Sequence, residues 1–129
     1  MEKVAERFIR YAKEYTTSNP GNDSTPSTKV QLVFLEKLEV ELKKIGCQEV
    51  ELDSNGYLMA TIPANNANNA PVVGFIAHVD TSPDFNGENV QPRIVTNYDG
   101  GVIQLNNNVS IDPAEFPEIG QYKIGRAHV

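Results

Sequence analysis

The spacing of apolar residues predicts two helices in the N-terminal part of the chain. The first covers residues 2–16 and carries a single apolar face, which we expect to pack on a sheet. Its apolar positions recur three and four residues apart, at Val4, Phe8, Tyr11, Ala12 and Tyr15. The stretch TTSNPGNDSTPST (residues 16–28) has no such period and is rich in turn-forming residues, so it predicts an exposed loop.

The second predicted helix covers residues 28–45. Thr28 is suited to cap its first turn while Gln31 reaches back to the cap, as in a capping box. Gly46 stands where a helix ordinarily closes in the left-handed conformation. The apolar face of this helix comprises Val30, Phe34, Leu38, Leu42 and Ile45.

The rest of the chain predicts short strands. QEVEL (48–52) and YLMATI (57–62) flank an Asn-Gly pair that is typical of a tight hairpin. VVGFIA (72–77) is apolar without alternation, which predicts a central strand covered on both faces. PRIVTN and GVIQL predict two further short strands, joined by a turn at NYDGG. Helices followed by strands in this order indicate an α/β fold, with a mixed sheet and flanking helices.

Composition and charge narrow the class of protein. With 129 residues, of which 40% are hydrophobic, the chain has the length of one ordinary domain. A formal net charge of -6 and no cluster of Lys and Arg argue against nucleic acid or an anionic membrane as a partner. No apolar run reaches the about 18 residues of a membrane helix, and the N-terminus carries no secretion signal. The single cysteine, Cys47, agrees with a reducing compartment, so we expect a cytoplasmic location.

The C-terminal stretch IGRAHV (residues 124–129) resembles the in-frame translation of a DNA-sequencing adapter. We therefore expect residues 124–129 not to be native, with Lys123 at the border of the join. On this interpretation His78 is the one native histidine. Residues 1–123 are then expected to be a piece of a longer protein.

His78 and Asp80, in the sequence PVVGFIAHVDTSP, are the residues best suited to chemistry. Side chains two positions apart on a strand point to the same side, so an imidazole and a carboxylate would lie together at the end of the predicted strand. Ligand sites in open α/β sheets gather at strand ends. A metal-bound imidazole is held best when its other ring nitrogen donates to a carboxylate, and Asp80 is placed for that role.

Each of these candidate residues also has a simpler, structural interpretation. A lone His-x-Asp is more often a hydrogen-bonded pair or a cap than a metal ligand, and a zinc site needs three or four ligands. Asp84, Glu88 and Asp99 are further acidic residues that a substrate's amino terminus could meet, but each is more typical of a loop. Cys47 follows a helix-ending glycine, and small apolar packing is the commoner role of a free cysteine.

A longer set of motifs carries a resemblance to a known family. GFIAHVDTSPDFNGENVQP, followed by NYDGG and FPE, resembles the peptidase T family of tripeptide aminopeptidases. The resemblance begins at ERFIRYAKEYTTS, includes TPST, continues through IGCQEVELDSNGYLMATIPAN and reaches Tyr122. The short His-x-Asp is shared with a wider superfamily of zinc-dependent metallopeptidases, which includes aminoacylases and glutamate carboxypeptidases.

The resemblance implies a dinuclear-zinc exopeptidase that removes the N-terminal residue from small peptides, with a catalytic α/β domain and a smaller inserted domain. It implies that His78 binds one Zn²⁺ and that Asp80 is the catalytic-site residue that orients the imidazole. A bridging aspartate, a Glu-Glu pair with the general base, and the other ligands are implied beyond residue 123. Residues 1–123 would then be the N-terminal part of the catalytic domain, inactive alone and able to bind zinc only weakly.

Two other functions stay open at this point. A dipeptidase, a carboxypeptidase or an aminoacylase of the same superfamily would use the same metal core. A non-catalytic α/β binding module would need no more than a hydrogen bond between His78 and Asp80. The sequence singles out no residue for binding the peptide substrate, and it indicates no oligomeric state.

Overall fold

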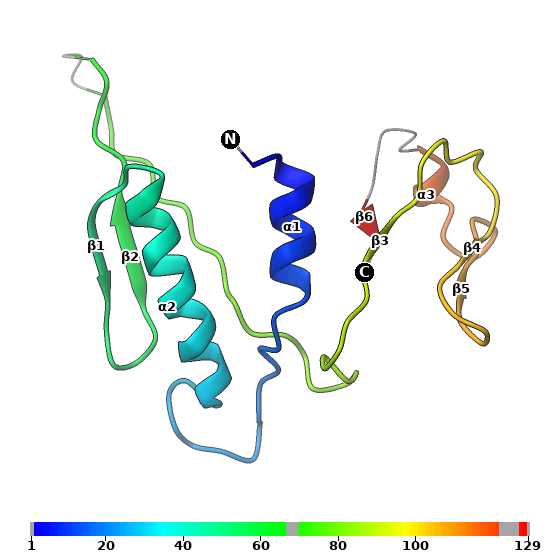
Figure 1. Cartoon of the computed structure of the whole chain (residues 1–129), viewed down its shortest axis with the longest axis horizontal. Coiled ribbons are helices and arrows are strands. Elements are labelled where there is room, and N and C mark those ends of the chain that lie inside the picture. The colour runs from blue at the N-terminus through cyan, green and yellow to red at the C-terminus, as the bar shows by residue number, and fades with distance from the viewer. Residues whose placement is uncertain (1, 67–69, 122–126, 129) are drawn as a thin grey trace. The chain divides into compact units, whose positions relative to one another are not determined.

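The computed structural model describes residues 2–66, 70–121 and 127–128. The chain divides into two compact parts, one of residues 14–89 and the other of residues 1–13 together with residues 90–129. Both are built from short elements joined by long irregular segments (Figure 1). The combination of helices with antiparallel strand pairs agrees with the α/β class expected from the sequence.

The longest helix, α2 (Lys29–Lys44), confirms the second predicted helix. It ends as its glycine predicts, because Gly46 adopts a φ of 96°. The main-chain N–H of Gly46 donates to the carbonyl of Lys43 (3.2 Å), and that of Cys47 donates to the carbonyl of Leu42 (3.0 Å). This is the Schellman arrangement, which pairs helix carbonyls that would otherwise lack a partner.

The buried face of α2 is narrower than the predicted apolar face. Phe34 and Leu35 are 7% and 5% exposed, and Gln31 is buried beside them. These positions are three and four residues apart, so they lie on one side of the helix. Ile45, at the end of the predicted face, is instead 54% exposed. The apolar core of this part of the chain therefore centres on the middle of α2.

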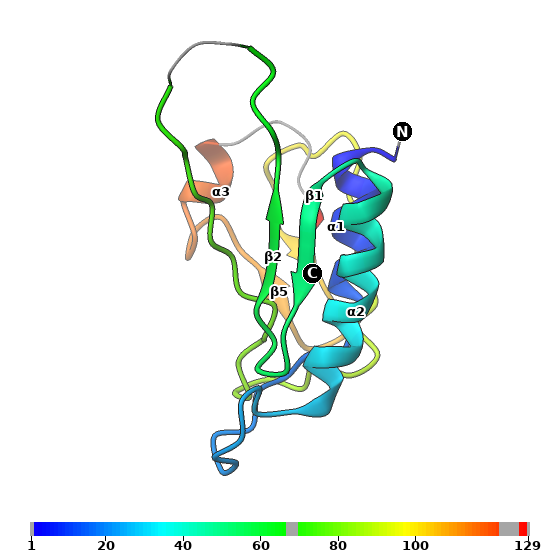
Figure 2. The same cartoon turned by 90° about the vertical axis from the view of Figure 1, so that its left-hand side faces the viewer.

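The hairpin predicted after this helix is also confirmed. β1 (Gln48–Leu52) pairs antiparallel with β2 (Leu58–Thr61), and Leu52 lies opposite Leu58. Figures 1 and 2 both show α2 lying along this hairpin. One helix and two strands thus form the packed unit from which the candidate site extends.

The hairpin loop contains the Asn55-Gly56 pair, as the sequence predicts. The N–H of Asp53 donates to the carbonyl of Tyr57 (3.1 Å), so the loop consists of residues 54–56. Gly56 has a φ of 83°. The carboxylate of Asp53 accepts main-chain N–H bonds from Asn55 (2.9 Å) and Tyr57 (2.8 Å). These bonds, with that from Tyr57 as the largest cause, hold the pKa of Asp53 below its ordinary value of 3.8.

The predicted central strand at residues 72–77 is wrong for this chain. These residues form neither helix nor strand, and Figure 1 draws them as an extended trace without an arrow. Val72, Phe75 and Ile76 are 99%, 95% and 102% exposed, so neither face is covered. A strand requires a neighbour that accepts and donates its main-chain hydrogen bonds. Among the described residues, no such neighbour lies beside this segment.

The single mixed sheet that the sequence predicts is also wrong for this chain. The described strands form three separate antiparallel pairs: β1 with β2, β3 (Arg93–Ile94) with β6 (Ala127–His128), and β4 (Ile103–Gln104) with β5 (Ser110–Ile111). Parallel pairing is confined, in the described part of the chain, to one bridge between Thr17 and Thr81.

Residues 1–13 and 90–129 contain the remaining elements. Two strands lie where PRIVTN and GVIQL predict them, but they pair with β6 and β5 instead of with each other. Among the residues of this part that the structure describes, the apolar side chains of Ile103 and Ile119 are buried, at 4% and 8% exposure. The elements are α1 (Val4–Ala12), β3 (Arg93–Ile94), β4 (Ile103–Gln104), β5 (Ser110–Ile111), α3 (Glu118–Gln121) and β6 (Ala127–His128).

Helix α1 is shorter than predicted and buries none of its residues. The helix contacts strand β6, but Val4 and Phe8 of the predicted apolar face are 84% and 45% exposed, so much of that face is uncovered. The helix begins with a local hydrogen bond from the main-chain N–H of Lys3 to the carboxylate of Glu6 (2.9 Å).

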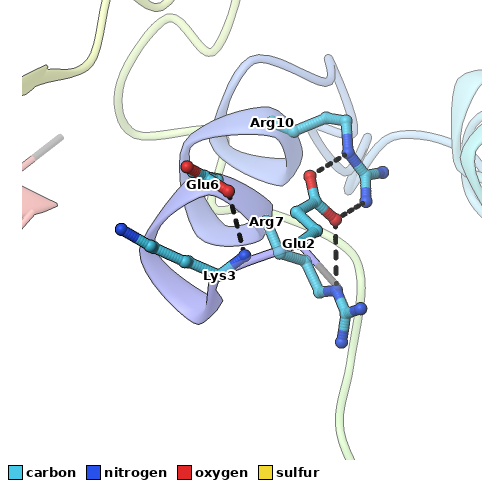
Figure 3. Close-up of polar contacts among 5 residues, drawn as sticks. All are labelled: Glu2, Lys3, Glu6, Arg7 and Arg10. Atoms are coloured by element: carbon cyan, nitrogen blue, oxygen red, sulfur yellow. Dashed lines mark hydrogen bonds and ion pairs between the residues drawn. The ribbon is translucent and has the colours of Figure 1, made fainter.

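An exposed ion cluster lies beside the first turns of α1 (Figure 3). The carboxylate of Glu2 accepts two bonds from the guanidinium of Arg10, at 3.1 and 2.7 Å, and one from Arg7 at 3.5 Å. The bonds from Arg10 are the largest cause of a pKa of Glu2 below its ordinary value. Exposed ion pairs of this kind contribute little to stability.

Candidate metal-ligating pair

His78 and Asp80 lie together, as the sequence predicts, although no strand presents them. The Nδ1 atom of His78 is 2.9 Å from Oδ1 of Asp80. A carboxylate only accepts hydrogen bonds, so in the neutral imidazole Nδ1 carries the proton and Nε2 keeps its lone pair. The side chain of His78 is 83% exposed and that of Asp80 is 46% exposed. The pair therefore presents an oriented imidazole nitrogen on an open surface.

The residue after the pair, Thr81, is bonded to a segment far away in the sequence. Its N–H donates to the carbonyl of Thr16 (3.3 Å). Its own carbonyl accepts from the N–H of Ser18 (3.0 Å) and from the hydroxyl of Ser18 (3.1 Å). The hydroxyls of Thr17 and Thr81 are 3.3 Å apart. The backbone is thus fixed one position beyond Asp80.

The predicted capping box between Thr28 and Gln31 does not form. Thr28 precedes α2 in an extended conformation, but its side chain makes no capping bond. Its hydroxyl donates instead to the carbonyl of Thr17 (3.0 Å), and the amide of Gln31 donates to the carbonyl of Thr16 (3.3 Å). The sequence carries no signal for these contacts, because they join the helix to residues outside its own turn.

The other acidic candidates take part in local turns. Asp84 accepts a bond from the serine hydroxyl two positions earlier (2.5 Å). The main-chain N–H of Glu88 donates to the side chain of Asn86 (2.9 Å), and the carboxylate of Asp99 accepts from the N–H of Gly101 (2.9 Å). Such bonds are typical of Asx and related turns and agree with the loop interpretation.

The described residues do not form a complete metal site. Within residues 2–66, 70–121 and 127–128, no group of three or more His, Cys, Asp or Glu could hold a metal ion. Cys47 is free, partly buried and part of the helix ending. Lys123 and Tyr122 lie outside the described residues. In the described part of the chain, no helix has the length and apolar character needed to cross a membrane.

Comparison with curated proteins confirms the resemblance indicated by the motifs. The chain is 48% identical over 124 residues to Peptidase T of Geobacillus kaustophilus and 50% identical over 125 residues to Peptidase T of Clostridium acetobutylicum. It is 51% identical over 121 residues to Peptidase T of Lysinibacillus sphaericus. These matches cover 94% to 95% of the chain, but the chain spans only 30% to 31% of the length of the relatives. No protein-family model matches the chain.

Proposed function

From its similarity to Peptidase T proteins over nearly its whole length, we propose that this chain is part of a peptidase. More narrowly, we propose that it belongs to the catalytic domain of a zinc-dependent aminopeptidase that removes the first residue from tripeptides. Because the relatives are about three times as long, the activity is proposed for the longer protein. The observation that carries the proposal is the His78–Asp80 pair, within the motif HVDTSPDF.

The donor atoms of the pair fit one ligand position of a zinc site. The hydrogen bond to Asp80 holds the proton on Nδ1, so the lone pair on Nε2 of His78 is free to bind a cation. Acceptance of that bond by a carboxylate also makes the imidazole a stronger ligand. Zinc, when bound, supplies Lewis-acid chemistry by polarising a peptide carbonyl and making a water molecule more acidic. Two zinc ions are expected in the complete active site, with the other ligands and the general base outside this pair.

The proposal also covers the partners, the location and the behaviour of residues 1–123 alone. The expected partners are a small peptide and no nucleic acid or membrane, and the expected location is the cytoplasm. Residues 1–123 alone should show no peptidase activity and should bind zinc weakly, because one imidazole is a single ligand of the three or four that zinc takes. Tight, stoichiometric zinc binding by residues 1–123 would contradict this.

Zinc content and tripeptide hydrolysis of the longer protein test the role of each residue. We expect His78→Ala to lose zinc and turnover together. We expect Asp80→Asn to weaken zinc affinity by about 10- to 100-fold, since it removes the partner of a metal-ligating histidine. Asp23→Asn, which changes an exposed loop carboxylate, is the matched control and should change neither quantity. Full zinc content with full turnover in His78→Ala would end the proposal.

A panel of substrates separates the related activities. Tripeptides, dipeptides and N-acyl amino acids are offered to the zinc-loaded longer protein. Turnover of tripeptides above the others supports the aminopeptidase. Turnover confined to acylated substrates would favour an aminoacylase, and binding without any turnover would favour a non-catalytic module.

A further inference from the structure

The His78–Asp80 pair ends a segment that gains no support from neighbouring chain. In the described part of the chain, no main-chain hydrogen bond joins residues 71–79 to another segment. The imidazole is 83% exposed, so packing does not hold the ring either. An exposed side chain without such restraint populates several rotamers, and ordering it costs entropy. Whatever orients the pair must therefore act through the backbone at Thr81, where the first bonds to another segment occur.

Thr81 is held by bonds that converge on it from residues 16–18. Its N–H and its carbonyl are both paired with this segment, and the hydroxyl of Ser18 adds a second donor to the carbonyl. The backbone of Gly87 packs closely against this segment, because a Cβ atom at Gly87 would lie 2.5 Å from the hydroxyl oxygen of Thr17. The backbone on the C-terminal side of Asp80 thus has a defined path.

Residues 16–18 are in turn fixed to the start of α2. The hydroxyl of Thr28 and the amide of Gln31 donate to two successive carbonyls, those of Thr17 (3.0 Å) and Thr16 (3.3 Å). Thr16 and Gln31 are each 4% exposed, so their bonds are shielded from competing water. Donors on a packed helix therefore fix a loop, and that loop fixes the residue next to the pair.

We propose that Thr28 and Gln31 are positioning residues for His78 and Asp80. They act through a set of residues that we name the Thr81 clamp, comprising Thr16, Thr17, Ser18, Thr28, Gln31 and Thr81. The clamp holds the backbone so that the carboxylate of Asp80 meets Nδ1 of His78 and leaves Nε2 available. The use of Nε2 for zinc rests on the proposed function, but the orientation of the pair by the clamp does not.

The tautomer of His78 in the metal-free 129-residue chain tests the clamp directly. The ¹⁵N shifts of the neutral imidazole report the ratio of the Nδ1–H to the Nε2–H form, and His78→Gln identifies the signals. Thr28→Val keeps the shape of the side chain and removes its hydroxyl. We expect it to lower this ratio by about threefold to tenfold, because the hydrogen bond from Nδ1 of His78 to the charged carboxylate of Asp80 is weakened. Thr28→Ser, which restores the hydroxyl, should return the ratio to that of the unchanged chain.

Two further variants separate positioning from general loss of stability. Gly46→Ala strains the opposite end of α2, where φ is 96°, and does not touch the clamp, so it should leave the tautomer ratio unchanged. Ser18→Ala removes one of two donors to Thr81 and serves if Thr28→Val does not fold. An unchanged ratio in folded Thr28→Val or Ser18→Ala overturns the inference, as does an equal fall in Gly46→Ala. Failure of the zinc proposal would appear separately, as zinc retained by His78→Ala in the longer protein.

Discussion

Alanine replacements at Phe34 and Phe75 test where the apolar core of residues 14–89 lies. Phe34 is 7% exposed, so its replacement removes a buried ring and leaves a cavity, at a cost of about 3–5 kcal/mol in the free energy of unfolding. Phe75 is 95% exposed. Its replacement removes almost no buried surface and should change that free energy by less than about 0.5 kcal/mol.

Urea unfolding followed by far-UV circular dichroism measures both changes. Because a small domain is stable by only about 5–15 kcal/mol, Phe34→Ala could unfold the chain outright. Phe34→Leu keeps most of the apolar volume and should cost about 1 kcal/mol, which keeps the comparison measurable. Phe75→Leu is its matched control at the exposed position.

The comparison has a clear refuting result. Equal losses for Phe34→Ala and Phe75→Ala would place the ring of Phe75 inside a packed core, as the apolar pattern of residues 72–77 predicts. The arrangement of this segment described above would then be wrong. A loss confined to Phe34 supports a core centred on α2.

Two further predictions concern single contacts. Gly87→Ala should lower the free energy of unfolding by about 1 kcal/mol, because the added Cβ crowds the hydroxyl of Thr17. Adding Thr17→Ala to the same chain should recover most of that loss. If the losses of the two single variants simply add in the double variant, the contact is contradicted. The pKa of Asp53 is lowered on folding, so its contribution to stability is present above the ordinary value of 3.8 and is lost as pH falls through the folded value. The urea concentration at the midpoint of unfolding should therefore decrease as the pH is lowered below about 4. This decrease should be smaller in Asp53→Ala. A carboxyl carbon of Asp53 that titrates at or above 3.8 by NMR would contradict this.

The features that the sequence predicted correctly depend on residues that are close to one another in the sequence. The apolar period of residues 29–44 and the left-handed conformation of Gly46 follow from local sterics and spacing. The hairpin follows in the same way, and the carboxylate of Asp53 accepts two main-chain N–H bonds within its loop. His78 and Asp80 were found because they are two positions apart, and a two-residue contact needs little of the fold.

The central strand was predicted wrongly because apolar composition indicates burial and not the partner that provides it. Residues 72–77 carry the composition of a strand with neighbours on both sides, and the described residues supply neither neighbour. PRIVTN and GVIQL illustrate the same limit in a milder form. Each forms a strand where predicted, but the partner of each lies elsewhere in the chain.

The clamp residues show why a correct local pattern can still give the wrong contact. Thr28 and Gln31 have the spacing of a capping box, and a side-chain cap stabilises a helix by about 1 kcal/mol. Gln31 is buried, however, and as a capping partner it would leave its amide hydrogens without an acceptor. An unsatisfied buried donor costs about 1–3 kcal/mol, which exceeds the gain from the cap, so bonds to the carbonyl of Thr16 and the hydroxyl of Ser27 prevail. The burial of Gln31 depends on the path of residues 16–28, and no window of sequence around one helix contains that path.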